Sequence, residues 1–107
     1  MVFADRRSFE MNFSERCYQI LRKVPKGKVT TYKALAEALG TKAYRAVGNA
    51  MNKNPRAPIV PCHRVINANG SLGGYASGLP KKIKMLKAEG IKIENNKIDL
   101  DKFEFKF

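Results

Sequence analysis

Apolar residues recur at helical spacing in three segments of the first half of the chain, and this pattern predicts three short helices. The first begins behind Ser14, a good N-cap residue, and its apolar positions are Phe13, Cys17, Ile20, Leu21 and Val24. In the second, Thr31 can serve as the N-cap and Gly40 can end the helix, while the apolar face consists of Leu35, Ala36 and Leu39. The third covers about residues 43–53, with a buried stripe of Ala43, Ala46, Val47, Ala50 and Met51. Two short helices joined by a tight, glycine-containing turn are typical of a helix-turn-helix.

The second half of the chain begins where Asn54 and Pro55 must end the third helix. Residues 59–66 are apolar at both ends, residues 67–70 form a turn signal, and the glycine-rich residues 73–78 predict a flexible loop. A last helix follows, with Pro80 in its first turn, Ile83 and Leu86 on its apolar face and Gly90 at its end.

Beyond residue 90 the apolar positions change to the period of a strand. Ile91, Ile93, Ile98 and Leu100 alternate like a short hairpin around Asn95 and Asn96, and the alternation continues through Phe103, Phe105 and Phe107. Residues 1–12 show no periodicity and fit a tail or an edge strand. We expect residues 1–107 to form one domain of mainly α class with small β elements, a winged-helix-like or helix-turn-helix fold, with residues 92–107 as a C-terminal hairpin or tail.

The composition fits a small intracellular domain. The chain has 107 residues, of which 44% are hydrophobic, enough for one modest core. Two cysteines cannot build the disulfide framework of a small secreted protein, and residues 1–7 lack the apolar core of a signal peptide. No apolar run approaches the roughly 18 to 20 residues that cross a bilayer. We therefore expect a cytoplasmic monomer without a membrane partner, because no coiled coil or long apolar edge is evident.

Charge narrows the class of partner. Lys and Arg number 21 against 9 acidic residues, and the formal net charge of +12 points to a polyanion. Residues 38–88 contain no Asp or Glu, so the basic excess is concentrated in the middle of the chain. On the third predicted helix, Arg45, Asn49 and Asn52 share the outer face, and Gly48 permits close approach of a ligand to the backbone. A nucleic acid fits these features, and a solvated lysine-rich surface is the alternative that charge alone leaves open.

Cys62 and His63 form the candidate reactive centre, and His63 is the chain's single histidine. A thiol reacts as its thiolate, so a nucleophilic cysteine needs a base or a positive environment, which His63 and Arg64 offer. Neighbouring residues on a strand face opposite sides, so direct contact between the pair needs a bend or a bridging water, and Pro61 favours such an irregular backbone. The alternative is a buried thiol beside a satisfied polar residue, which also describes Cys17. One histidine and two distant cysteines do not make a four-ligand zinc site.

The string Pro61-Cys62-His63-Arg64-Val65 resembles the active-site signature of the O6-alkylguanine-DNA alkyltransferases, the methylated-DNA-protein-cysteine methyltransferases. Four further motifs match this family in the same order, from about residue 13 to residue 91. They are Thr31-Tyr32 with Leu35-Ala36, residues 45–51 with Asn54-Pro55, Gly74-Tyr75 with Gly78-Leu79, and residues 87–90. Five separated motifs in one order are far more specific than any of them alone, and they place the similarity in the family's C-terminal active-site domain.

The resemblance implies a protein that binds the minor groove of duplex DNA, flips an O6-alkylated guanine out of the stack and moves the alkyl group irreversibly to Cys62. Arg45 matches the side chain that fills the hole left by the flipped base. Small residues on the same helix let it enter the narrow groove, and lysines and arginines contact phosphates. The DNA-binding residues implied in this way are Thr31, Arg45, Ala46, Gly48, Asn49, Asn52 and Lys53.

The resemblance also implies roles in the pocket and no cofactor. His63 acts as a base through water, Glu89 orients its imidazole, and Asn54 helps to hold this network. Tyr32 assists protonation of the guanine leaving group and contacts a phosphate. The substrate-binding residues are Met51 in the pocket wall, Val65 and Cys62 through their carbonyls, and Tyr75 and the Ala76 N–H facing the O6 region.

Two departures from the family accompany this resemblance. Position 76 is Ala where the family often has Ser, which removes one hydroxyl donor near O6, and only about a dozen residues precede the first helix where the family usually has an N-terminal domain. The family's noncatalytic relatives are similarly short but have another residue, typically Trp, where Cys62 stands, so the cysteine favours transfer. A non-reacting lesion-binding protein that recruits other repair factors, and a helix-turn-helix regulator, are the alternatives.

Overall fold

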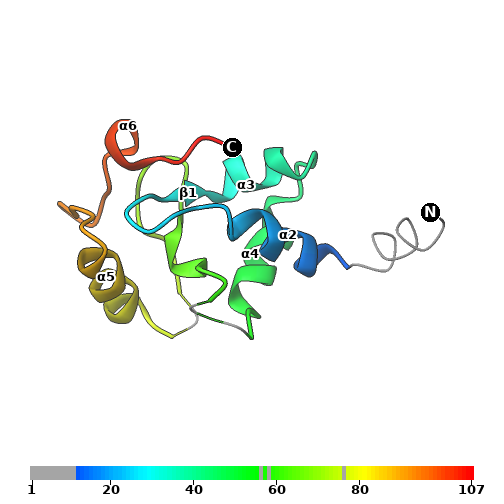
Figure 1. The fold of residues 1–107 in the computed structure, drawn as a ribbon, viewed down its shortest axis with the longest axis horizontal. Helices are drawn as coiled ribbons and strands as arrows, with labels where there is room; N and C mark the ends of the chain where they lie inside the picture. Colours follow the sequence, from blue (N-terminus) through cyan, green and yellow to red (C-terminus); the bar gives the residue numbers. More distant parts are fainter. Residues whose placement is uncertain (1–11, 56, 58, 76) are drawn as a thin grey trace.

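The structure is a computed structural model that describes residues 12–55, 57, 59–75 and 77–107. Its elements, in chain order, are α2 (Phe13–Leu21), β1 (Thr30–Thr31), α3 (Tyr32–Ala38), α4 (Tyr44–Asn52), the 3-10 turn η1 (Cys62–Arg64), β2 (Val65–Ile66), α5 (Leu79–Ala88) and α6 (Leu100–Phe103). Helices α2, α3 and α4 gather at one end of the molecule, and α5 and α6 lie at the other (Figure 1). The predicted fold class, mainly helical with small β elements, is confirmed.

Side-chain caps set where the first helices begin. Thr31 caps α3 as predicted, since its Oγ1 accepts a hydrogen bond of 2.9 Å from the backbone N–H of Ala34. The predicted N-cap Ser14 is wrong, because Asn12 caps α2 and accepts from the N–H of Glu15 at 2.8 Å. Asn12 has the extended backbone of a cap, whereas Ser14 lies within the helix.

Helix α4 is shorter at both ends than predicted. It begins at Tyr44, after Ala43, which gives it no side-chain cap and is exposed rather than part of the buried stripe. Val47, Ala50 and Met51 are buried as predicted. The hydroxyl of Tyr18 on α2 donates a 2.7 Å hydrogen bond to the Ala50 carbonyl, which fixes α4 against α2.

Two hydrophobic clusters meet at the short parallel sheet. The helical cluster joins α2, α3 and α4 to the turn η1, called the reactive turn below. Its buried members include Cys17, Leu21, Leu35, Val47, Met51, Val60, Cys62 and Val65. The second cluster lies toward α5 and consists of Val29, Ile66, Leu72, Leu86, Ile91 and Ile98. Strands β1 and β2 pair Thr30 with Val65 and Thr31 with Ile66. Because side chains alternate along a strand, Val65 and Ile66 enter different clusters.

The C-terminal segment folds back onto both halves. Asn95 and Asn96 have φ of 53° and 59°, and Glu94 and Lys97 exchange two backbone hydrogen bonds around them, so the predicted turn forms. The predicted alternation ends at Ile98, because Asp99 caps α6. Past α6, the Phe105 N–H donates to the Val29 carbonyl at 2.7 Å, and the Val29 N–H donates to the Phe103 carbonyl at 2.9 Å.

Candidate active site and nucleic-acid interface

The reactive pair lies on a tight turn rather than on a strand. Cys62 and His63 begin η1, where the Arg64 N–H donates to the Pro61 carbonyl at 2.9 Å. This confirms the irregular backbone predicted from Pro61. Cys62 is 4% exposed and His63 is 1% exposed, so both lie beneath the surface. Asn54 stabilises the approach to the turn, since its Nδ2 donates to the Val60 carbonyl at 2.7 Å.

Glu89, the C-cap residue of α5, holds the imidazole in place. Its Oε2 lies 2.8 Å from His63 Nε2 and 2.7 Å from Arg64 Nη2, and its Oε1 accepts from Arg64 Nε at 2.9 Å. The third guanidinium contact goes to the Val24 carbonyl at 2.9 Å. Arg64 is therefore committed to an internal two-point ion pair rather than to the phosphate contact predicted for the basic side chains.

The protonation states follow from these contacts. Burial acts to raise the pKa of Glu89, but hydrogen bonds from Arg64 and His63, and their charges, hold it below its ordinary 4.5. Burial lowers the pKa of His63 below its ordinary 6.5 and outweighs the opposing hydrogen bond and charge of Glu89. Glu89 is then an anion and His63 neutral at neutral pH, so Nε2 carries the proton donated to Glu89 and Nδ1 presents a lone pair. Nδ1 is buried without a hydrogen-bond partner among the described residues.

A negative charge on Cys62 would affect the pKa values of two tyrosines, Tyr32 and Tyr75. Burial raises the pKa of Tyr32, and so does the charge of Cys62. Burial, the charge of Cys62 and a hydrogen bond with Cys62 raise the pKa of Tyr75. Both phenols therefore keep their protons at neutral pH. The Tyr75 hydroxyl also lies 3.7 Å from the sulfur of Met85 on α5.

Two further predicted pocket residues lie in the hydrophobic core. Met51 and Val65 are buried in the helical cluster, at its contact with Cys62. Ala76 lies outside the described residues.

Lys82 is a site residue that sequence reasoning missed. Its side chain is 0% exposed, and its Nζ donates to the carbonyls of Val65 at 2.7 Å, Leu72 at 2.5 Å and Gly74 at 3.0 Å. Burial lowers the pKa of Lys82 to about 8, against the opposing effect of Cys62. Lys82 is therefore not one of the phosphate contacts predicted for the lysines. Its position four residues before the buried Leu86 was the available signal.

The predicted DNA face is exposed along α4. Arg45, Asn49, Asn52 and Lys53 are exposed, and Ala46 and Gly48 are half-buried. A Cβ atom on Gly48 would meet nothing within 4 Å, so its missing side chain leaves the helix surface open. Thr31 lies apart from this face, since it is 4% exposed and its hydroxyl caps α3. Its DNA contact stays a prediction that this placement disfavours.

A groove of about 400 Å³ lies beside the start of α4. It is lined by Tyr32, Lys33, Tyr44, Asn67 and Ala68. It connects the beginning of α3 with the turn after β2.

The described part of the chain shows neither a metal site nor a membrane-spanning helix. No group of three or more His, Cys, Asp or Glu residues there is arranged to hold a metal ion. Among the same residues, no helix combines the length and apolar character needed to cross a bilayer.

Comparison with known proteins places this arrangement in a family. Residues 12–91, which include Cys62, His63 and Glu89, match the family model described as "6-O-methylguanine DNA methyltransferase, DNA binding domain". A methylated-DNA–protein-cysteine methyltransferase of Methanosarcina acetivorans is 53% identical over 79 residues, which are 73% of this chain and 51% of that protein. This chain spans about half, or less, of the length of the curated relatives it matches.

Two solved structures with bound DNA share the fold. Mycobacterium tuberculosis OGT in complex with DNA has a TM-score of 0.72 at 42% identity, covering 75% of this chain and 49% of that one. S. pombe Atl1, in complex with damaged DNA containing O6-carboxymethylguanine, has a TM-score of 0.80 at 30% identity, covering 89% of this chain and 95% of that one. The matched residues and the shared helix-turn-helix fold show that the chain belongs to the family of the 6-O-methylguanine DNA methyltransferase DNA-binding domain.

Proposed function

We propose that this protein repairs DNA by transferring an alkyl group from O6 of guanine in a duplex to the sulfur of Cys62, once per molecule. The observation that carries this proposal is the order of groups at η1. A thiol is followed directly by a buried imidazole, whose Nε2 is 2.8 Å from the Glu89 carboxylate. That carboxylate is held in turn by Arg64. A nucleophile, a base and an orienting anion are the parts that activate a weakly acidic nucleophile.

The exposed face of α4 would enter the minor groove. Half-buried Ala46 and Gly48 offer little bulk, so the helix backbone can approach the floor of a narrow groove. Arg45 projects from the same helix and would occupy the space left when the damaged base rotates out of the stack. The groove lined by Tyr32, Lys33 and Asn67 lies beside this face and would receive the adjoining phosphate backbone.

Transfer would proceed as a displacement at the alkyl carbon. The Cys62 proton passes to His63 Nδ1 through water, and the sulfur forms a bond to the carbon as the bond from carbon to O6 breaks. The electron pair of that bond stays with the guanine, which takes a proton from Tyr32 or water, and the proton held by His63 then passes through water to that donor. The products are guanine and an uncharged thioether on Cys62, and because nothing removes the thioether the protein acts once.

The other predicted pocket residues would recognise the base. The carbonyls of Cys62 and Val65 accept from the exocyclic amine of guanine, while Tyr75 and the Ala76 N–H face the O6 region. Met51 forms the wall. These contacts need no cofactor.

A second candidate is a lesion-binding protein that does not react. Two observations favour it: Cys62 is only 4% exposed, and the chain resembles Atl1 over 95% of that protein's length. In this case the pocket would hold the damaged base while other repair proteins are recruited.

Intact-mass analysis separates these functions. After incubation with a duplex containing one O6-methylguanine, transfer adds the mass of one methyl group at Cys62, whereas a lesion-binding protein keeps its original mass. Cys62→Ala should abolish the addition and retain duplex binding. Cys17→Ala is the matched control, because Cys17 is fully buried on α2, and this variant should still accept the methyl group. An unmodified wild-type chain that binds the lesion tightly would refute transfer.

A further inference from the structure

Lys82 carries a charge that its hydrogen bonds do not neutralise. The side chain is fully buried, and the three groups that accept from its Nζ are uncharged carbonyls. No ion pair formed between described residues includes Lys82. A buried ammonium without a nearby anion is strongly disfavoured, so the fold must gain something from keeping it there.

The turn η1, which carries Cys62, lies against the helix that carries Lys82. Helix α5 packs against η1, and a negative charge on Cys62 would raise the pKa of Lys82 against the effect of burial. The positive charges of Arg64 and Lys82 also contribute to lowering the pKa of His63. Arg64 is already paired with the Glu89 carboxylate, so its charge is balanced. Among the described groups, Cys62 is the ionisable group next to this helix whose charge is not already paired, so a thiolate formed there during transfer would balance Lys82.

The three carbonyls give Lys82 a second, mechanical effect. Val65 belongs to β2 and follows the reactive turn, while Leu72 and Gly74 lie in the segment that leads to Tyr75. One ammonium therefore ties the segment before Tyr75 to the strand after Cys62. Tyr75, which follows this segment, packs against the hydrophobic cluster that contains Cys62.

We propose that Lys82 is a positioning residue for the transfer reaction: it supplies the counter-charge of the Cys62 thiolate and holds residues 72–74 against β2, so that Tyr75 faces the sulfur. The inference rests on the proposed function. An ionised thiol and a buried ammonium are each unfavourable alone, and together each lowers the free energy of the other. Once the sulfur is a thioether, it can no longer carry the negative charge that Lys82 would balance.

Thiolate absorbance in the ultraviolet tests the charge without DNA. The difference between each chain and its Cys62→Ala counterpart isolates the thiolate of Cys62 as the pH is raised. Lys82→Gln keeps two N–H donors for the carbonyls and removes the charge, so the pH at which half of Cys62 is ionised should rise by about one unit or more. Lys82→Arg keeps a positive charge, so its titration midpoint for Cys62 should lie closer to that of the wild type. Lys81→Gln, the same charge change at an exposed position on α5, should leave the titration unchanged.

Two further measurements complete the test. Circular dichroism establishes that each variant is folded, and if Lys82→Gln does not fold, Lys82→Met, which is uncharged and close in size, takes its place. Methyl transfer is then measured at a pH below the titration midpoint of Cys62. Its rate in the uncharged variant should fall about tenfold if that midpoint rises by one pH unit, while affinity for the lesion duplex changes little.

The outcomes are distinguishable. A titration of Cys62 that is the same in wild type and in a folded, uncharged variant overturns the role of Lys82, whether or not the protein transfers methyl groups. A titration midpoint that rises in the uncharged variant, in a protein whose wild-type chain never gains a methyl group, supports the charge pairing and refutes the proposed function instead.

Discussion

At the scale of single residues, Glu89 determines what His63 can do. Its carboxylate accepts from Nε2 at 2.8 Å, which fixes the tautomer and turns the Nδ1 lone pair away from Glu89. The same carboxylate binds Arg64 at two points, so it also holds a half-buried cation. Removing its charge therefore affects both stability and the base.

Glu89→Gln should destabilise the protein by about 1–3 kcal/mol at neutral pH, because Arg64 loses its anionic partner. The pKa of Glu89 is held below 4.5 in the folded chain, so its contribution to stability is complete above that pH. The contribution is lost as the pH falls through the lowered pKa. Urea denaturation at a series of pH values should show wild type and variant converging in acid.

The control for this experiment is Glu94→Gln, which removes an exposed carboxylate 3.9 Å from Lys92. It should change the free energy of unfolding by less than about 0.5 kcal/mol at any pH. If the difference in the free energy of unfolding between wild type and Glu89→Gln stays constant as the pH is lowered into the acid range, Glu89 is not the ionised partner of Arg64.

The sequence was most informative where a residue's role follows from a local motif. Cys62, His63 and Glu89 belong to such motifs, and the structure brings His63 and Glu89 together across 26 positions. Lys82 was expected to be solvated or phosphate-binding and Arg64 to give Cys62 a positive environment, because a basic segment without acids gives no sign of which side chain turns inward. Only the path of the loop before Tyr75 brings three carbonyls to one ammonium.

At the scale of elements, Gly48 in α4 has two opposed effects: it weakens the helix, and it leaves the helix backbone open to a ligand. Gly48 lies inside a helix of nine residues, where glycine weakens helix formation, and a Cβ atom there would meet nothing within 4 Å. Folding therefore gains nothing visible from the missing side chain. The missing side chain would instead allow the close approach to DNA that the proposed function requires.

Gly48→Ala should stabilise the protein by about 0.5–1 kcal/mol and weaken duplex binding by about tenfold. Thermal unfolding measures the first effect and fluorescence anisotropy with a labelled duplex the second. Gln19→Ala, at an exposed position of α2, should leave duplex affinity unchanged. Unchanged duplex affinity in Gly48→Ala would remove this residue from the proposed interface.

Two glycines test how the C-terminal segment supports the turn after β2. Gly40 and Gly70 both have positive φ, +75° and +89°, but a Cβ atom on Gly40 meets nothing, whereas one on Gly70 would lie 2.7 Å from the Ile98 carbonyl oxygen. Gly40→Ala should cost about 1–2 kcal/mol from backbone strain alone. Gly70→Ala should cost about 1–3 kcal/mol more, because backbone must move. If chemical denaturation shows equal losses of stability for the two variants, the backbone at Ile98 moves aside without cost.

Element boundaries show why patterns predicted some parts of the fold and not others. Thr31 and Gly40 mark α3 by chemistry that acts within a few residues, so the sequence predicted both ends. The alternation of Phe103, Phe105 and Phe107 resembled a strand, yet Asp99 begins a helical turn first. Val29, far away in sequence, then pairs with the chain beyond α6. Such long-range pairing leaves no local signal.

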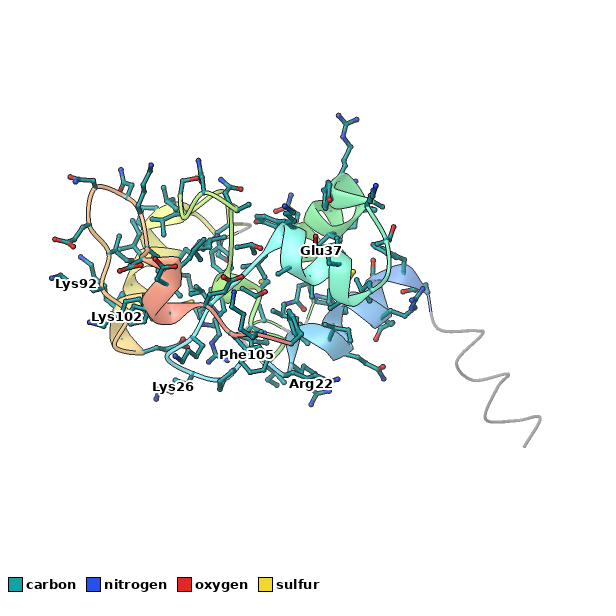
Figure 2. All side chains as sticks on the ribbon, turned by 90° about the horizontal axis from the view of Figure 1, so that it is seen from above. Arg22, Lys26, Glu37, Lys92, Lys102 and Phe105 are labelled. Carbon is teal, nitrogen blue, oxygen red and sulfur yellow. The ribbon has the colours of Figure 1, made fainter. Side chains whose placement is uncertain are left out.

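At the scale of the whole molecule, the basic excess is spread over more than the predicted DNA face. Arg22, Lys26, Lys92 and Lys102 project from separate parts of the surface (Figure 2). A net charge of +12 attracts any duplex from all sides and speeds encounter, whereas only charges that touch phosphates release bound counterions. The salt dependence of binding can therefore separate contact from general attraction.

Lys53, which follows α4, should contact a phosphate, and Lys92, at the α5 end of the molecule, should not. Both are exposed, and replacing either by Ala removes one positive charge. In a plot of log affinity against log salt, Lys53→Ala should reduce the slope by about one, while Lys92→Ala leaves it unchanged. Affinities for lesion and undamaged duplexes should fall together with salt, because the recognition of the flipped base uses uncharged contacts. Equal slopes for the two variants would mean that the charge acts only at long range, and that α4 is not the element in contact with the duplex.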